Sequence, residues 1–134
     1  MPLVRIDLST SHTAEVRGAI AAGVHRALRD AIGIPAGDRF QIITTHEPGE
    51  LVFDPDYLGV ARTDVVYVQI TLVGGRPEKL KLELYRRITE NLAEAGVRPD
   101  DVFVVLTETG LADWSVGNGE AQLVAQGTVP GLAE

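Results

Sequence analysis

The chain contains no cysteine among its 134 residues. Disulfide bonds, a thiol nucleophile and cysteine-ligated metals or iron–sulfur clusters are therefore excluded. Positive charge is also scarce, because 12 Lys and Arg face 19 Asp and Glu, which gives a net charge of −7 without any basic cluster. This balance argues against non-specific binding to nucleic acid or to an anionic membrane surface.

Long apolar runs are missing as well, since no stretch approaches the roughly 20 apolar residues that a membrane-spanning helix needs. Near the N-terminus, Arg5 and Asp7 stand where a signal peptide would be apolar. The absence of cysteine suits a reducing compartment, so we expect a cytoplasmic protein. The length fits a single domain over residues 1–134, and 45% apolar residues suffice for a folded core.

The first third of the chain changes from the period of a strand to that of a helix and back. Residues 3–8 alternate apolar and charged side chains, which predicts a strand with one wet face. From residue 13 to 32 an apolar residue recurs at every fourth position, which predicts a helix that Gly33 ends. Residues 39–45 predict a second strand, so that 3–45 form a first β-α-β unit.

The same order repeats in the second half of the chain. Residues 65–73 predict a β-branched strand, and Pro77 is expected at the first position of the helix that follows. Residues 102–106 predict the last strand. Together they make 65–107 a second β-α-β unit.

The two units are related by an offset of 63 residues, which takes Asp38 to Asp101. Each helix is long enough to return the chain parallel to the strand before it. The predicted fold is α+β, a four-stranded sheet with two helices on one face. Its other face stays bare in a single chain, so we expect association to cover it.

Three segments lie outside these units. The breakers in residues 46–63 predict an extended loop with a short strand near 51–53. Residues 117–119, Gly-Asn-Gly, are a tight-turn signal of the hairpin type. The last segment, residues 120–134, is too apolar for a free tail, and we expect it to pack on a neighbouring subunit.

Most motifs for cofactors and nucleophiles are absent from the sequence. It has no P-loop, no Gly-x-Ser-x-Gly elbow and no complete dinucleotide-binding fingerprint. His12, His25 and His46 lie 13 and 21 residues apart, which is not the spacing of metal ligands. We interpret them as solvated or capping side chains and expect neither a metal nor a cofactor.

Pro2 is the remaining chemical candidate. An initiator methionine before so small a residue is normally removed, which would leave a free prolyl amine at the start of a strand. An α-amino group titrates near a pH of about 8, so this amine could act as a general base or, when protonated, as a general acid. It could also form an iminium with a carbonyl compound. Alone, however, a proline at position 2 is common and uninformative.

Four motifs in order give Pro2 a context. They are Pro2-Leu3-Val4-Arg5-Ile6-Asp7-Leu8, Ile34-Pro35-x-x-Asp38-Arg39-Phe40-Gln41-Ile42, Gly74-Gly75-Arg76, and Ala112-Asp113-Trp114-Ser115-x-Gly117-x-Gly119. In this order they resemble the tautomerase superfamily, and within it the malonate semialdehyde decarboxylase branch. The resemblance extends from residue 2 to about residue 122. It implies a duplicated β-α-β fold that assembles as a homotrimer.

The resemblance also implies catalytic roles. Pro2 matches the N-terminal catalytic proline, Asp38 the aspartate that assists proton transfer or orients water, and Arg76 the arginine that binds the substrate carboxylate. Arginine suits that task because its guanidinium offers a bidentate fork to a carboxylate. The alternative is structural: an arginine in solvent and an aspartate that caps its own turn.

Three further residues are candidates for the wall of the substrate site. Trp114 matches an aromatic wall of the family, with a core tryptophan as the alternative, and Val116 and Leu123 extend the predicted lining. Two departures bear on the substrate. Some decarboxylases of this branch carry a second arginine shortly before the position of Arg76, and residues 71–75 offer none. Val116 also stands where related sequences often have an aromatic residue.

We therefore predict a cofactor-free enzyme acting on a small oxo acid, most similar to malonate semialdehyde decarboxylase, with hydratase or tautomerase side activity. A first alternative is a keto–enol tautomerase of a 2-oxo acid such as phenylpyruvate. The two need opposite protonation states of Pro2, protonated for decarboxylation and neutral for tautomerisation. A second alternative is a non-catalytic trimeric binding module. It applies if Met1 is retained, because an acylated proline nitrogen has no basic lone pair.

Overall fold

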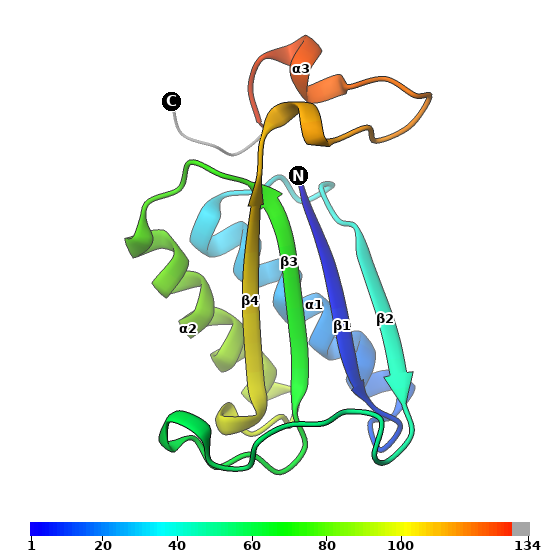
Figure 1. Ribbon diagram of the computed structural model, residues 1–134, viewed down its shortest axis with the longest axis vertical. Coiled ribbons are helices and arrows are strands. Elements are labelled where there is room, and N and C mark those ends of the chain that lie inside the picture. Colours follow the sequence, from blue (N-terminus) through cyan, green and yellow to red (C-terminus); the bar gives the residue numbers. More distant parts are fainter. Residues whose placement is uncertain (130–134) are drawn as a thin grey trace.

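The structure, a computed structural model, describes residues 1–129 (Figure 1). Its strands are β1 (Pro2–Ser9), β2 (Gln41–His46), β3 (Val66–Val73) and β4 (Val102–Thr109), and its long helices are α1 (Ala14–Ile32) and α2 (Glu78–Glu94). The short helices are η1 (Tyr57–Gly59), η2 (Pro99–Asp101), η3 (Leu111–Asp113) and α3 (Gln122–Gln126).

The four strands form one sheet in the order β2-β1-β3-β4. Within each unit the strands are parallel, and the units meet along the antiparallel pair β1 and β3. Pro2 therefore pairs with Leu72, and the start of β1 lies beside the end of β3. Both long helices lie behind the same face of the sheet (Figure 1). The predicted fold of two β-α-β units is confirmed.

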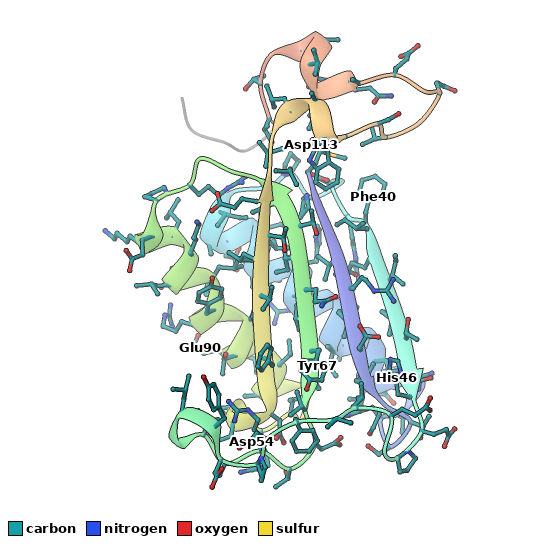
Figure 2. All side chains as sticks on the ribbon, viewed as in Figure 1. Phe40, His46, Asp54, Tyr67, Glu90 and Asp113 are labelled. Carbon is teal, nitrogen blue, oxygen red and sulfur yellow. The ribbon has the colours of Figure 1, made fainter. Side chains whose placement is uncertain are left out.

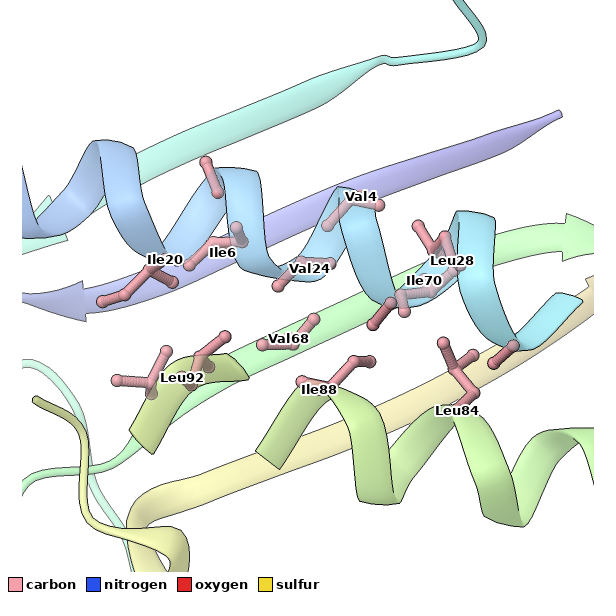
Figure 3. Packing of buried hydrophobic residues seen from close by; sticks show 14 of the residues in the cluster. Val4, Ile6, Ile20, Val24, Leu28, Val68, Ile70, Leu84, Ile88 and Leu92 are labelled. Atoms are coloured by element: carbon pink, nitrogen blue, oxygen red, sulfur yellow. The ribbon is translucent and has the colours of Figure 1, made fainter. Parts of the chain in front are cut away.

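The core lies between the sheet and the helices (Figure 3). The four-residue period of each helix is the reason, because it places its apolar side chains in one stripe that faces the sheet. Burying a side chain of this size is worth roughly 1.5–3 kcal/mol. The fully buried members of the two stripes are Ile20, Val24 and Leu28 of α1 and Leu84, Ile88 and Leu92 of α2. Among residues 1–129, no helix combines the length and the apolar character needed to cross a membrane.

The helix ends depart from expectation at one place. In α1 the Thr13 hydroxyl accepts from the Val16 N–H at 3.2 Å, and Gly33 ends the helix in the left-handed conformation. In α2 Pro77 is the cap and not the first helical residue, so that prediction is wrong by one position. The reason is the ψ of Pro77, which is 156° and extended, so that helical backbone begins only at Glu78.

Two local predictions in the loops are also wrong. Residues 51–53 form no strand, and the Val52 carbonyl accepts instead from the Tyr67 hydroxyl at 2.7 Å. Residues 117–119 do turn, but no paired strands flank the turn. The Gln122 side chain closes it, since it accepts from the Val116 N–H at 3.0 Å and donates to the Gly117 carbonyl at 2.8 Å.

The face of the sheet opposite the helices is open in this chain. Ile42, Phe103 and Val105 lie on it and are each about two-fifths exposed. Tyr67 packs edge-on against Phe103, with 5.2 Å between the ring centroids. A partly apolar bare face, as predicted, is typical of a surface that other chains cover.

The C-terminal segment covers the end of its own sheet. Leu123 and Val129 are buried against Val73 of β3. Val124 is exposed, so the predicted packing on a neighbouring subunit stays a prediction for this side of α3. Of the segment 120–134, residues 130–134 lie outside the described part of the chain.

Candidate functional site

Three parts of the chain meet at one end of the sheet, where β1 begins and β3 ends. β1 and β2 are parallel, so the loop before β2, which carries Asp38, lies beside the start of β1. β3 runs antiparallel to β1 and therefore ends beside the start of β1, and Arg76 follows shortly after the end of β3. The Met1 amine lies 3.1 Å from Asp38 Oδ2. The topology thus brings together Pro2, Asp38 and Arg76.

Asp38 is a buried carboxylate, 8% exposed, and neither of its oxygens accepts a hydrogen bond from the described residues. Its backbone N–H donates to the Pro35 carbonyl at 3.0 Å, so the turn is closed by the backbone and not by the side chain. The structural alternative, an aspartate that caps its own turn, is therefore wrong. Its charge is balanced by the Met1 ammonium and by Arg76 nearby.

Arg76 is buried to the same degree, so it is not an arginine in solvent. Its Nη1 donates to the Val73 carbonyl at 3.1 Å, whereas Nε and Nη2 have no hydrogen-bond partner in the part of the chain that the structure describes. Nε and Nη2 form one edge of the guanidinium, which can bind both oxygens of a carboxylate. Desolvation lowers the pKa of Arg76, and Asp38 and Glu108 oppose this shift. An arginine nevertheless remains charged at neutral pH.

The distribution of unpartnered polar atoms singles out this place. Within residues 1–129, five buried side-chain nitrogen and oxygen atoms lack a hydrogen bond, and four of them belong to Asp38 and Arg76. Each such atom costs about 1–3 kcal/mol when it is left without a partner. Their concentration beside the N-terminus is what a site for a polar ligand requires.

Trp114 lies at the same end of the sheet, on the small cluster on which Met1 also packs. Its indole Nε1 donates to the Thr109 hydroxyl at 2.7 Å, and that hydroxyl donates to the Leu72 carbonyl at 3.2 Å. The ring is thereby fixed across the ends of β3 and β4, and with Met1 it packs on the small cluster around Leu123. In Figure 2 the labelled Asp113 and Phe40 mark this end of the molecule.

The other two predicted wall residues differ from each other. Val116 is 45% exposed on the loop after Trp114, whereas Leu123 is 3% exposed inside the small cluster. Leu123 therefore lies behind Trp114 and Met1. A substrate contact for Val116 and Leu123 stays a prediction.

Glu108, near the end of β4, is a site residue that sequence reasoning missed. Its carboxylate forms an ion pair with Lys81 and lies close to the Gly75 N–H, which also contributes to lowering its pKa. The Lys81 hydrogen bond is the main reason why the pKa of Glu108 is lowered. No motif could have indicated Glu108, because its partners come from the turn before α2 and from α2 itself.

A cavity of about 420 Å³ lies at the opposite end of the sheet and not at Asp38. Its lining includes Ser9, Ser11, Thr63 and Asp64. Ser11 donates to Asp64 at 3.1 Å, so polar groups of this lining are already paired within the chain. We place the candidate site at Asp38 and Arg76, because buried charged groups whose polar atoms lack hydrogen bonds indicate a ligand more strongly than hollow volume does.

The histidines serve separate local contacts. His25 is buried, with Nε2 2.9 Å from the Ala36 carbonyl, so it is a core residue and not the solvated or capping side chain expected. His46 Nε2 lies 2.7 Å from Asp7 Oδ1. His12 Nε2 lies 3.4 Å from Asp64 Oδ2 at the far end of the sheet.

Comparison with known families and proteins agrees with this geometry. A family described as "Tautomerase enzyme" matches residues 38–117, and a second family of the same description matches residues 2–61. "Probable tautomerase YusQ" from Bacillus subtilis (strain 168) is 37% identical over 126 residues, which cover 92% of this chain and 99% of that protein. "Probable tautomerase YrdN" from the same organism is 33% identical over 125 residues, with 92% and 97% covered.

Solved structures agree in fold and in sequence. FG41 malonate semialdehyde decarboxylase inhibited by 3-bromopropiolate superposes with a TM-score of 0.90 at 42% identity, covering 96% of this chain and 99% of that one. Another malonate semialdehyde decarboxylase has a TM-score of 0.87 at 36% identity, with 95% and 99% covered. A fused 4-OT, at 22% identity and a TM-score of 0.78, shares the fold, with 92% of this chain and 98% of that one covered.

Proposed function

Because this chain is an enzyme of the tautomerase superfamily, in its malonate semialdehyde decarboxylase-like branch, we propose that it decarboxylates a small 3-oxo acid without a cofactor. The supporting observation is the set of four buried atoms on Asp38 and Arg76, beside the N-terminus, that have no hydrogen bond within the described residues. Two relatives that are malonate semialdehyde decarboxylases, at 42% and 36% identity, favour this substrate class.

Removal of Met1 is the first step of the proposal. Met1 packs on the cluster that holds Leu123 and Trp114, and its amine faces Asp38. Its loss would free the Pro2 nitrogen and open the space between Trp114, Asp38 and Arg76. Intact mass of the purified protein tests this step, and a species that retains Met1 would instead support the non-catalytic binding module.

In the proposed reaction, the other residues of the site have separate roles. The Nε and Nη2 donors of Arg76 bind the substrate carboxylate, and protonated Pro2 donates to the carbonyl oxygen. The bond between the carboxylate carbon and its neighbour then breaks, its electron pair forms the enol, and carbon dioxide leaves. Protonation of the enol carbon gives the aldehyde or ketone, so that one solvent proton is consumed. Asp38 orients the proton transfer, and Trp114 shields the site from water.

Pro2 can also act through an iminium with the substrate carbonyl, which serves as the electron sink in place of the hydrogen-bonded carbonyl. Borohydride added during turnover would reduce an iminium to a stable amine. An intact mass increased by the reduced substrate would support the covalent route. An unchanged mass under full turnover would support the acid route.

Keto–enol tautomerisation is the second candidate, which the names of the two Bacillus relatives favour. It requires neutral Pro2, as does attack of the amine on a carbonyl to form an iminium. The pKa of the Pro2 amine therefore separates tautomerisation from decarboxylation by the acid route, and the borohydride experiment tests the iminium route. Titration of ¹⁵N-labelled Pro2 by NMR measures this pKa. A value well above about 8 supports the acid of a decarboxylase, and a value near or below about 7 supports the base of a tautomerase.

A homotrimer is the proposed assembly, and the open sheet face with Ile42, Phe103 and Val105 supports it. Light scattering coupled to gel filtration should give the mass of three chains. The mass of one chain at micromolar concentration would contradict the assembly.

A spectrophotometric screen tests the activity itself. Wild type, Pro2→Ala and Arg76→Ala are compared on malonate semialdehyde, phenylenolpyruvate and halogenated acrylates, with Arg98→Ala at the far end as the control. We expect malonate semialdehyde to react best, and each site variant to lose on the order of 100-fold in kcat/KM. Full activity of Pro2→Ala would rule out the N-terminal amine, and full activity of Arg76→Ala would rule out the carboxylate-binding site.

A further inference from the structure

The turn that carries Arg76 has a carboxylate against its backbone. A Cβ atom at Gly74 would lie 2.7 Å from Glu108 Oε2, which is closer than van der Waals contact allows. The φ of Gly74 does not lie in the left-handed region, so a side chain at this position would not strain the backbone but would force the Glu108 carboxylate to shift. The Gly74 N–H also donates to the Thr109 carbonyl at 2.9 Å. The turn is thus held to the end of β4 by its backbone and packed against the Glu108 side chain.

Glu108 is itself held in place. Lys81, in the first turns of α2, forms an ion pair with its carboxylate, and the Gly75 N–H lies near enough to help lower the pKa of that carboxylate. Glu108 therefore connects β4, the Gly74–Gly75 turn and α2. Its contacts lie on both sides of Arg76 in the sequence, at the turn before it and in the helix after it.

The guanidinium of Arg76 has few contacts of its own that could orient it. Its one hydrogen bond within the described chain goes from Nη1 to the Val73 carbonyl, at the other end of the same turn. The conformation of the turn therefore decides where the free Nε–Nη2 edge points. Glu108 lies near enough to act against the lowering of the Arg76 pKa, but the two residues form no ion pair within 4 Å. The edge that would bind a carboxylate stays free.

We propose that Glu108 is a positioning residue that fixes the Gly74–Gly75 turn and so aims Arg76 at the substrate carboxylate. This inference rests on the proposed role of Arg76. A displacement of about 1 Å in a binding group can cost 100-fold in rate, so a chain with a single arginine in this segment depends on the turn that holds it.

The test measures binding and turnover in purified protein without Met1. Glu108→Ala should raise the KM for malonate semialdehyde about tenfold, and weaken the binding of malonate in calorimetry to the same extent, because Arg76 is no longer aimed. Glu108→Gln keeps a side chain of the same size, with an acceptor oxygen, against the Gly74 backbone and should stay within about threefold of wild type. Glu90→Ala, an exposed acid of α2 paired with Arg86, is the control and should change neither value.

A purely electrostatic role would give the opposite sign. If Glu108 only repelled the substrate carboxylate, both Glu108→Ala and Glu108→Gln would tighten malonate binding, and the proposal would be overturned. A purely structural role would lower the melting temperature and leave malonate affinity unchanged, which would overturn it as well.

Two double-mutant cycles complete the test. Gly74→Ala should weaken malonate binding in wild type but not in Glu108→Ala, because the atom that its Cβ would meet is then absent. Glu108→Ala should have no effect on malonate binding in the Arg76→Ala background. An equal effect in both backgrounds would overturn the positioning role. Unchanged activity of Arg76→Ala alone would refute the proposed function, whereas an inactive Arg76→Ala with an unaffected Glu108→Ala would refute this inference only.

Discussion

Two aspartates at equivalent places in the two halves of the chain have opposite surroundings. Asp38 and Asp101 lie 63 residues apart, each is buried, and each precedes the second strand of its unit. Asp101 accepts from the Thr63 N–H at 2.8 Å, the Asp64 N–H at 3.1 Å and the Thr63 hydroxyl at 3.2 Å. Asp38 accepts no hydrogen bond from residues 1–129 and faces the Met1 amine at 3.1 Å.

The difference follows from what precedes the first strand of each unit. Before β3, Thr63 and Asp64 are ordinary peptide-linked residues, and their backbone N–H groups donate to the Asp101 carboxylate. At β1 the corresponding partner is an amine, which can take up and release a proton. The same position in a duplicated fold is therefore structural in one unit and available for chemistry in the other.

The starts of the two helices differ in the same way. The offset of 63 takes Thr13 to Arg76. Thr13 uses its side chain for the cap of α1, whereas α2 has no side-chain cap and Arg76 lies near Asp38. The first unit contributes the amine and Asp38, the second contributes Arg76, and the proposed chemistry needs both.

The largest effect is expected from Asp38, the aspartate without a hydrogen bond in the described chain. Asp38→Asn should lower kcat/KM on the order of 100-fold, because it removes the carboxylate that we propose assists proton transfer. The free energy of unfolding should change by less than about 1 kcal/mol, since no hydrogen bond is broken. Steady-state kinetics and urea unfolding measure the two. A strongly destabilised variant would make Asp38 as structural as Asp101.

The converse is expected at the equivalent position. Asp101→Ala should cost about 2 kcal/mol of unfolding free energy, because it leaves the Thr63 and Asp64 N–H groups without an acceptor. The kcat of the folded protein should stay within about threefold of wild type, since the change is at the far end of the sheet. If Asp101→Ala lost as much kcat as Asp38→Asn, the inference that only Asp38 is available for chemistry would be contradicted.

A smaller effect is expected at the helix starts. Thr13→Ala removes the cap of α1 and should cost about 1 kcal/mol of stability. Activity should be unchanged, in contrast to Arg76→Ala at the equivalent place. Thr13→Ser keeps the hydroxyl and is the matched control, which should unfold close to wild type in a urea titration.

The smallest effect concerns acid stability, where α2 differs from α1. Hydrogen bonding to Arg86 is the main reason why the pKa of Glu83 is lowered to about 2. A lowered pKa stabilises the folded state above the ordinary value of 4.5, and this contribution is lost as the pH falls toward 2. Glu83→Gln should therefore be slightly less stable than wild type at a pH of about 6, with the difference vanishing as the pH approaches the lowered pKa. Thermal unfolding across this range measures it, and a constant difference would contradict the ion pair.

The sequence predicts best what local periodicity determines. In the long helices, apolar residues at every fourth position admit only one buried face, and Ile20 and Leu28 of α1 and Ile88 of α2 are fully buried on it. The site depends on contacts between distant parts of the chain. The resemblance to the tautomerase superfamily indicates Asp38 and Arg76, and the strand arrangement explains why these residues, 38 positions apart, lie close together.

Tertiary contacts explain what the sequence did not predict. The apolar run at residues 51–53 suits a strand, but no neighbouring edge pairs with it. The packing of Met1 and Trp114 on the cluster that contains Leu123 is a tertiary contact that no sequence pattern indicates. Glu108 is one acid among many until its contacts with Gly74 and Lys81 are known.

The hydrogen bond from Trp114 to Thr109 has a spectroscopic consequence. Trp114 is the single tryptophan of the chain, so the indole emission of the whole protein originates in the small cluster on which Met1 packs. Loss of Met1 or arrival of an anion changes the polarity around that one ring. The enzyme therefore contains its own fluorescent reporter, and ligand titrations need no dye.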